Sequence, residues 1–304
     1  MMNIAVLMAC HNRRETTIRC LSALHEAVKQ VMGDGGAWRF SVFLVDDGST
    51  DGTAEAVVEW RGNMPSPATL SLHVISGSGS LYWAKGMALA WREALKHETT
   101  CQTKSLPRGF NVFTHFLWLN DDVDLFPDAL ETLFNDLQGS DVVLQRTNAR
   151  HWMAVLVGSC CDAAGCVSYG VTDGNCQLLV PAGKPVESCG WMSGNVVLVP
   201  RQVWERVGII DEAYTHARAD FDYAERLKKA GVPFFASSRF VGCCQSDWDD
   251  RMRGMPLLAR IATLWHPGYC NLHDLWLIRS RYHGKVRALI SCLHMIALVF
   301  RRVR

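Results

Sequence analysis

Four short apolar runs, each followed by a polar turn and then by a helix-like pattern, constrain the fold of this chain most strongly. The runs lie at 3–9, 40–45, 70–75 and 115–119. Four consecutive strand-then-helix units predict an α/β fold with a doubly wound, mostly parallel central sheet. Strands buried in such a sheet are near-continuous apolar runs, as these are.

The polar turns after the four runs read CHNRR, DDGSTDG, GSGSLYWAKG and NDDVD. In open α/β sheets ligands bind outside the carboxyl ends of the strands. All four turns fall at those ends, so we expect them to line one rim of the sheet.

The second half of the chain departs from this pattern. Further strands, partly antiparallel, are predicted at 142–157, 167–169 and 196–199. Helices are predicted at 201–207 and 221–230. The segment 242–265 mixes Asp, Arg, Gly and Met without a clear period, and we expect it to be a loop.

Composition excludes several classes of protein. The chain has 304 residues, of which 49% are hydrophobic and 20% charged, which is typical of a globular protein. A net charge of +1 favours neither a nucleic acid nor an acidic partner. The 12 Cys show no CxxC spacing, which argues against a structural zinc site. No secretory signal precedes the first run, which predicts a cytoplasmic location and reduced thiols.

An acidic cluster follows the fourth run, with Asn120, Asp121, Asp122 and Asp124 in close succession. Crowded carboxylates raise each other's pKa unless a cation lies among them. Oxygen ligands without nearby His or Cys suit Mg²⁺ or Mn²⁺, whose open positions substrate phosphates fill. The alternative is a helix N-cap, which accounts for one Asp but not for three. The cluster therefore predicts a site for a metal and a diphosphate.

Three other candidate sites keep two interpretations each. Asp46 and Asp47 could bind a nucleobase or ribose, or form an ordinary Asx turn. Lys85 opens a helix after a Gly-rich loop and could bind phosphate, or be an exposed lysine. Asp220 and Asp222 could supply a general base, or stabilise the start of an amphipathic helix.

Taken together and in order, the motifs resemble those of the family 2 inverting glycosyltransferases with the GT-A fold, in particular bacterial members that build surface polysaccharides. The resemblance covers about residues 3–245 and rests on these stretches: HNR, VDDGSTDGT, GSGSLYWAKGM, WLNDDVDLFPDAL, GWMSGNVVLVPRQVWERVGIIDE and DFDYAERLKKAGV. It implies a catalytic domain at 1–245, with a Rossmann-like nucleotide-sugar-binding half at about 1–125 and a smaller, mixed acceptor half at about 126–245. Residues 246–304 form a C-terminal loop and tail.

The resemblance also implies roles on the donor side. The family uses a nucleotide-diphosphate sugar and a divalent metal, Mg²⁺ or Mn²⁺, and inverts the anomeric carbon. Nucleotide-sugar contacts are expected from Asn12, Arg13, Asp46, Asp47, Ser49, Lys85, Asn120 and Asp121. The family's Asp-x-Asp matches either 120–122 or 122–124, so Asp122 is the strongest metal ligand and Asp124 the second.

On the acceptor side, Asp220 matches the family's catalytic base. Many members have Glu-Asp there, where this chain has Ala219-Asp220, and Asp222 is an alternative base. The pocket for donor sugar and acceptor is expected at Trp191, Ser193, Gly194 and Asn195. The acceptor would be a glycan or a lipid-linked glycan.

The apolar tail at 288–300 is shorter than the roughly 20 residues that span a bilayer, and basic residues flank it. It could be an interfacial helix in peripheral contact with the cytoplasmic membrane leaflet, or an ordinary helix docked on the catalytic domain. Two alternative functions also stay open. A sugar-phosphate nucleotidyltransferase would more naturally carry glycine after the first strand, and a non-catalytic nucleotide-sugar-binding subunit would fit the missing Glu.

Overall fold

The computed structural model describes residues 2–33, 38–63, 70–102, 112–139, 153–246, 254–269 and 271–300. The first part contains four strands and three helices: β1 (Met2–Cys10), α1 (Arg14–Gly33), β2 (Trp38–Asp46), α2 (Thr53–Gly62), β3 (Leu70–Ser76), α3 (Tyr82–Gln102) and β4 (His115–Leu119). The strands pair in parallel in the order β3-β2-β1-β4. The predicted parallel half of the sheet is confirmed.

The second part extends the same sheet with a mixed set of strands. Its elements are β5 (Asp124–Leu125), α4 (Ala129–Gly139), β6 (Val155–Cys161), β7 (Val167–Tyr169), β8 (Val186–Glu187), β9 (Val196–Pro200), α6 (Arg201–Val207), α7 (Ala219–Lys229) and β10 (Phe234–Cys243). Strand β9 lies antiparallel between β4 and β6, which confirms the predicted change of direction. The strand predicted at 142–157 begins only at Val155, and its first part, up to 152, lies outside the described residues.

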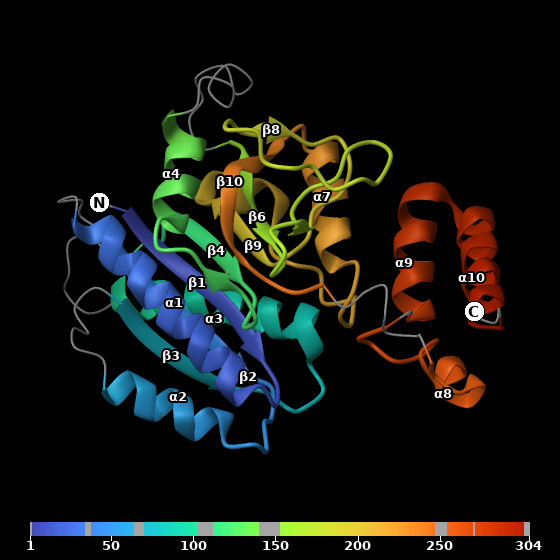
Figure 1. The fold of residues 1–304 in the computed structure, drawn as a ribbon, viewed down its shortest axis with the longest axis horizontal. Coiled ribbons are helices and arrows are strands. Elements are labelled where there is room, and N and C mark those ends of the chain that lie inside the picture. The colour runs from blue at the N-terminus through green and yellow to red at the C-terminus, as the bar shows by residue number, and fades with distance from the viewer. Residues whose placement is uncertain are drawn as a thin grey trace.

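Both faces of the sheet are covered, as a doubly wound fold requires (Figure 1). Along β1, Val6 and Met8 pack into the core beneath α1 and α4, while Ala5 and Leu7 pack into the core beneath α3 and α7. Successive side chains of a strand point to opposite faces, so a strand buried on both faces is apolar throughout. That is why the first run carries no polar alternation.

The described residues of the C-terminal part form three helices, α8 (Leu257–Ala262), α9 (Leu272–His283) and α10 (Lys285–Phe300). The expectation of a loop over 242–265 was wrong at both ends, because β10 reaches Cys243 and α8 is a helix. Gly284, with φ of 86°, joins α9 to α10. Figure 1 shows these two helices side by side outside the sheet, next to α7. Among the described residues, no helix is long and apolar enough to cross a bilayer.

Candidate active site

A cavity of about 780 Å³ opens where the carboxyl ends of β1, β2 and β4 meet the start of α7. Each of the four polar turns predicted to converge contributes residues to its wall, so that expectation is confirmed. The predicted site residues that line it are Arg13, Asp47, Asn120, Asp121, Asp122, Trp191, Ser193, Gly194, Asn195 and Asp220. Those outside the lining are Asn12, Asp46, Ser49, Lys85, Asp124 and Asp222.

Arg13 lies between two carboxylates of the acidic cluster. Its Nη1 donates to Asp121 Oδ1 at 2.9 Å and to Asp122 Oδ2 at 2.8 Å. Asp121 is buried, and this burial, with the nearby Asp122 charge, raises its pKa to about 6 although Arg13 acts in the opposite direction. The side chain of Asp122 is 30% exposed. Asp122 is therefore the carboxylate of this pair that a ligand in the cavity can reach.

Asp124 faces elsewhere. Both of its carboxylate oxygens accept from Arg19 Nε, at 2.6 and 2.9 Å, and β5 pairs with β10 at Asp124 and Cys243. The register 120–122 thus faces the cavity, and the register 122–124 does not. Among the described residues, no group of three or more His, Cys, Asp or Glu could hold a metal ion by itself. A divalent ion at Asp122 would need oxygen ligands from a bound diphosphate, which is how Mg²⁺ is commonly held.

Asp47 holds the loop that leads into α3. Its carboxylate accepts from the backbone amides of Gly79, Leu81 and Tyr82 at 2.7, 2.8 and 2.9 Å. A Cβ on Gly77 would stand 2.7 Å from Asp47 Oδ1, so the close approach of the loop requires glycine there. Asp47 lines the cavity while fixing the loop that forms its wall.

The remaining residues predicted to contact the nucleotide lie outside the cavity lining, in or next to the turns that form its wall. Asn12 donates its backbone amide to Ser49 Oγ at 2.9 Å, and its side chain accepts from Thr50 N at 2.7 Å. Asp46 is buried and accepts from Ser49 N at 3.1 Å. Lys85 is half-buried in the first turn of α3. Asn12, Asp46 and Ser49 thus join the first and second turns, and none of these four residues lines the cavity.

On the opposite side, Asp220 lies in the first turn of α7. Its carboxylate accepts from Gly194 N at 3.1 Å and from Phe221 N at 2.9 Å. Burial raises the pKa of Asp220 to about 6, and the two amide donors limit the rise. The group is thus a carboxylate at neutral pH, yet more basic than an ordinary aspartate.

Gly194 links the two sides of the cavity. A Cβ at this position would stand 2.4 Å from Trp83 Cζ2, so the indole packs directly over the glycine backbone. Trp83 Nε1 in turn donates to Asn120 Oδ1 at 2.7 Å. Asn120 also donates its backbone amide to Asn195 O at 2.9 Å. A continuous set of contacts therefore runs from the base candidate to the acidic cluster.

The other predicted pocket residues shape the wall between these sites. Trp191 stacks on Phe221, with ring centroids 4.8 Å apart and planes 15° apart. Ser193 Oγ donates to Gly170 O at 2.9 Å and accepts from Gly170 N at 2.8 Å. Trp191 presents the kind of flat apolar surface on which sugar rings pack, and Ser193 fixes the segment that carries Gly194.

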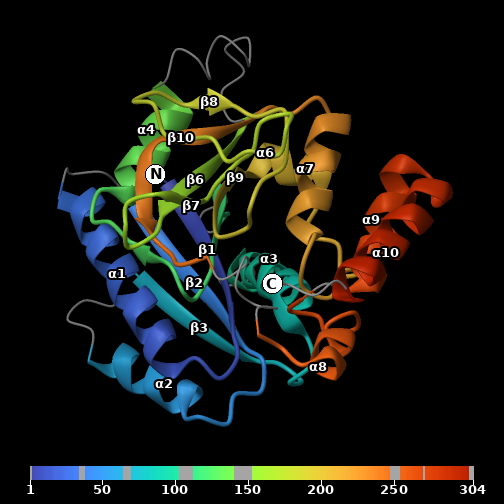
Figure 2. The same cartoon turned by 45° about the vertical axis from the view of Figure 1, so that its right-hand side comes forward.

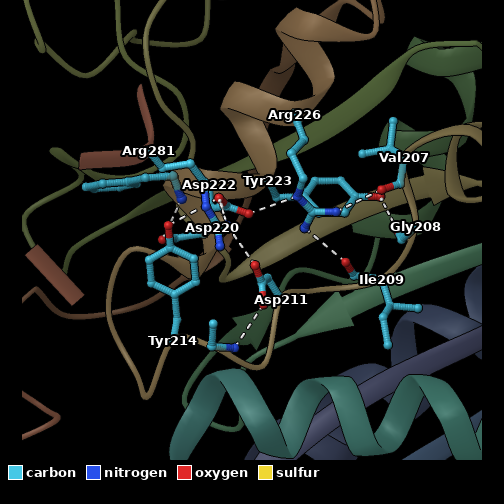
Figure 3. A network of polar contacts seen from close by, with 12 residues as sticks. Val207, Gly208, Ile209, Asp211, Tyr214, Asp220, Asp222, Tyr223, Arg226 and Arg281 are labelled. Carbon is cyan, nitrogen blue, oxygen red and sulfur yellow. Dashed lines mark hydrogen bonds and ion pairs between the residues drawn. The ribbon is translucent and has the colours of Figure 1, made fainter. Parts of the chain in front are cut away.

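Asp222 faces away from the cavity into a polar network (Figure 3). Its side chain is completely buried. It accepts from Arg226 Nε, Arg281 Nη1 and the Tyr282 hydroxyl, each at 2.8 Å, and from the Tyr214 hydroxyl at 3.2 Å. Arg281 and Tyr282 belong to α9, so this carboxylate fastens the C-terminal part to α7. The geometry favours Asp220 over Asp222 as the base.

Several lining residues were missed from the sequence, among them His11, His216, Arg218 and His266. The loop before α7 carries two of them and is held by Asp274, a buried residue of α9. Asp274 accepts from Thr215 N at 3.1 Å, Thr215 Oγ1 at 2.8 Å and His216 N at 3.3 Å. The HARAD stretch beside the predicted base was the available signal for His216 and Arg218. No local pattern indicated Asp274, because its partners lie nearly sixty positions earlier.

Comparisons with known proteins bear on the family of the chain. Residues 5–153 match the family model described as Glycosyl transferase family 2. The chain is 28% identical over 204 residues to the Mycobacterium tuberculosis N-acetylglucosaminyl-diphospho-decaprenol L-rhamnosyltransferase. The matched region covers 63% of this chain and 62% of that protein. The chain therefore spans less than two thirds of the relative's length.

Two solved structures share the fold. The mannosyltransferase PcManGT from Pyrobaculum calidifontis, in complex with GDP-Man and Mn²⁺, matches with a TM-score of 0.53 and 16% identity, over 97% of this chain and 69% of that one. S. aureus TarS 1–349 matches with a TM-score of 0.51 and 14% identity, over 100% of this chain and 76% of that one. At these identities the likeness shows the fold alone, and it confirms the predicted GT-A type of α/β sheet.

Proposed function

The chain belongs to glycosyl transferase family 2, and from this premise we propose that it transfers a sugar from a nucleotide-diphosphate donor to a hydroxyl acceptor with inversion. The observation that carries the proposal is that Asp122 and Asp220, from different elements, line one cavity. Inversion in a single displacement needs a base on the face of the sugar opposite the leaving diphosphate. A reachable carboxylate at one site and a basic carboxylate at the other meet that need.

On the donor side, Mg²⁺ or Mn²⁺ held at Asp122, with Asp121 beside it, would neutralise the charge that develops on the leaving diphosphate. Arg13 already lies at these carboxylates and would also contact the diphosphate. Asp46 and Asp47 end the strand beside the nucleoside pocket that we propose, with Asp47 fixing its wall through three backbone bonds. Asn120 orients Trp83 over the same space.

On the acceptor side, Asp220 would take the proton from the attacking hydroxyl. General bases work best when their pKa lies near the operating pH, and burial moves this carboxyl in that direction. The Gly194 amide and the start of α7 hold the carboxylate in one orientation. Trp191 would support the sugar ring between donor and acceptor.

We place the reaction in the assembly of a bacterial surface polysaccharide, such as a lipopolysaccharide, capsule or exopolysaccharide. The name of the Mycobacterium tuberculosis relative, a rhamnosyltransferase acting on a diphospho-decaprenol sugar, supports a lipid-linked acceptor. The absence of Glu before Asp220 does not remove the base, since the Asp220 carboxylate itself lines the cavity.

The test is donor hydrolysis by the purified chain, using a panel of UDP-, GDP- and dTDP-sugars with and without Mn²⁺. We expect slow, metal-dependent release of one nucleoside diphosphate, lost in Asp122→Ala and retained in Asp124→Asn. Release of pyrophosphate or of a nucleoside monophosphate would identify a nucleotidyltransferase instead. Metal-dependent nucleotide binding without release, even when lipid-linked glycan acceptors are added, would indicate a non-catalytic binding subunit.

A further inference from the structure

We propose that α10 and α8 together form a surface that lies on an anionic lipid bilayer, with α10 parallel to the plane of the membrane. The proposal joins the two interpretations of the tail. One face of α10 docks on the protein, and the opposite face meets lipid.

The docked face of α10 packs against α9. Ala288 and Val299 are completely buried, and Cys292 Sγ donates to Leu272 O at 4.0 Å. At 100° per residue these three positions fall on one side of the helix. The helix is therefore held in place along this side, through Ala288, Cys292 and Val299.

The opposite side of α10 carries a second apolar stripe that the described part of the protein leaves exposed. Each of its large side chains is more than half exposed, and they follow helical spacing: Val286, Leu289, Ile290, Leu293 and Phe300. A contiguous apolar patch of this kind marks an interaction surface, whereas single exposed apolar residues need no explanation. A stripe on one side of a helix too short to span a bilayer fits the interface between headgroups and acyl chains.

The positive charge of the C-terminal region indicates an anionic partner. Residues 254–304 contain eight of the 31 Lys and Arg but only one of the 30 Asp and Glu, so they carry a formal charge of +7 and the rest of the chain −6. Lys285 and Arg287 are exposed beside the apolar stripe, and α10 contains no acidic residue. Basic residues next to an apolar stripe are attracted to anionic headgroups, whereas two copies of such a surface would repel each other.

Helix α8 extends the surface. Leu257 and Leu258 are exposed, and so is Trp265, at 67%, just after the helix. Arg260 Nη2 donates to Leu298 O at 3.1 Å, which ties α8 to the last turn of α10. Figure 2 shows α8 below α9 and α10.

The position of this surface has a functional meaning. His266 and Gly268 line the cavity, and exposed Trp265 directly precedes them in the chain. A membrane in contact with α8 and α10 would therefore lie beside the cavity. This reading of the surface rests on the proposed function, since it presents the acceptor side to a lipid-linked substrate. Binding to the membrane does not depend on turnover.

The experiment is vesicle flotation of the full chain with phosphatidylcholine vesicles and with vesicles containing about one third phosphatidylglycerol. The test variant replaces Leu289, Ile290 and Leu293 with serine, and the control is Val58→Ser, an exposed apolar residue of α2. We expect the wild type and the control to float with anionic vesicles, and the test variant to lose at least about tenfold in affinity. Circular dichroism and donor hydrolysis on the same samples establish that the variant is folded and report separately on the proposed function.

Four results would overturn the proposal. The wild type could remain unbound with both kinds of vesicle, or the triple variant could float as well as the wild type. Sedimentation velocity could show a dimer that the triple variant abolishes, which would assign the stripe to a second copy of the chain. Equal flotation with neutral and anionic vesicles would remove the role of charge.

Discussion

Asp222→Asn should lower the stability of the protein, whereas Asp220→Asn, two residues earlier on the same helix, should not. The buried Asp222 carboxylate accepts four side-chain hydrogen bonds, two of them from guanidinium groups. Asparagine has the same shape but no charge, and its amide nitrogen would face donors. Both arginines would lose a charged partner, and because they bond to different carboxylate oxygens, the one that faces the amide nitrogen would also lose its acceptor.

The magnitude follows from this geometry. Breaking a buried ion pair by removing one partner costs about 3–5 kcal/mol. The lower end applies here, because Arg226 and Arg281 are 22% and 33% exposed and have other acceptors. Arg226 also donates to Val207 O and Ile209 O, and Arg281 to Asp211. We therefore expect a loss of about 3 kcal/mol in the free energy of unfolding.

The assay is urea unfolding at pH 8, with trypsin cleavage at Lys285 as a readout for release of α9. Tyr282→Phe removes one neutral donor from the same carboxylate and should cost only about 1 kcal/mol. Asp220→Asn should be at least as stable as the wild type. The pKa of Asp220 is raised to about 6, so its ionised form is disfavoured in the folded protein above that pH. Equal unfolding curves for Asp222→Asn and the wild type would refute the reasoning.

Three further predictions concern activity. Sugar transfer should increase as pH rises through about 6, because Asp220 must lose its proton to act as the base; a flat profile between about pH 5 and 8 would exclude this role. Asp122→Asn should lower kcat/KM at least about 100-fold and remove the metal dependence of nucleotide binding in calorimetry, while Asp124→Asn should change neither. Equal effects of the two substitutions would indicate that the register 122–124 binds the metal. Gly194→Ala should lower kcat more than about tenfold, because its Cβ would stand 2.4 Å from the Trp83 ring; wild-type kcat would mean that the indole can move aside.

The sheet could be predicted where local sequence decides structure. The run at 115–119 coincides with β4, and the first three runs differ from β1, β2 and β3 by one or two residues at most at either end. Strand β10 was not predicted, because its centre carries the polar residues Ser237, Ser238 and Arg239. These are accommodated by contacts from distant elements, such as the bond from Ser238 N to Asp136 Oδ2 at 2.7 Å. No pattern within the strand itself reports those partners.

The site could be predicted as a set of turns but not residue by residue. Helical geometry separates Asp220 and Asp222 by about 200°, so one faces the cavity and the other must face the protein. Which of them does so depends on Arg281 and Tyr282, some 60 positions later in the chain. Likewise, Asp124 is drawn away from the cluster by Arg19, a partner more than a hundred positions earlier.

The Arg13 guanidinium between Asp121 and Asp122 has a consequence for the order in which ligands bind. A divalent ion that reaches Asp122 competes with a cation that is tethered to the same chain and therefore present at high effective concentration. An ion that binds without a diphosphate replaces the pair of Asp122 and Arg13 with a pair of Asp122 and the metal. The net gain in binding free energy is therefore small. An ion that arrives with a diphosphate gives Arg13 new oxygens to bind. Donor and metal should then each raise the affinity for the other by the same factor, as linkage requires.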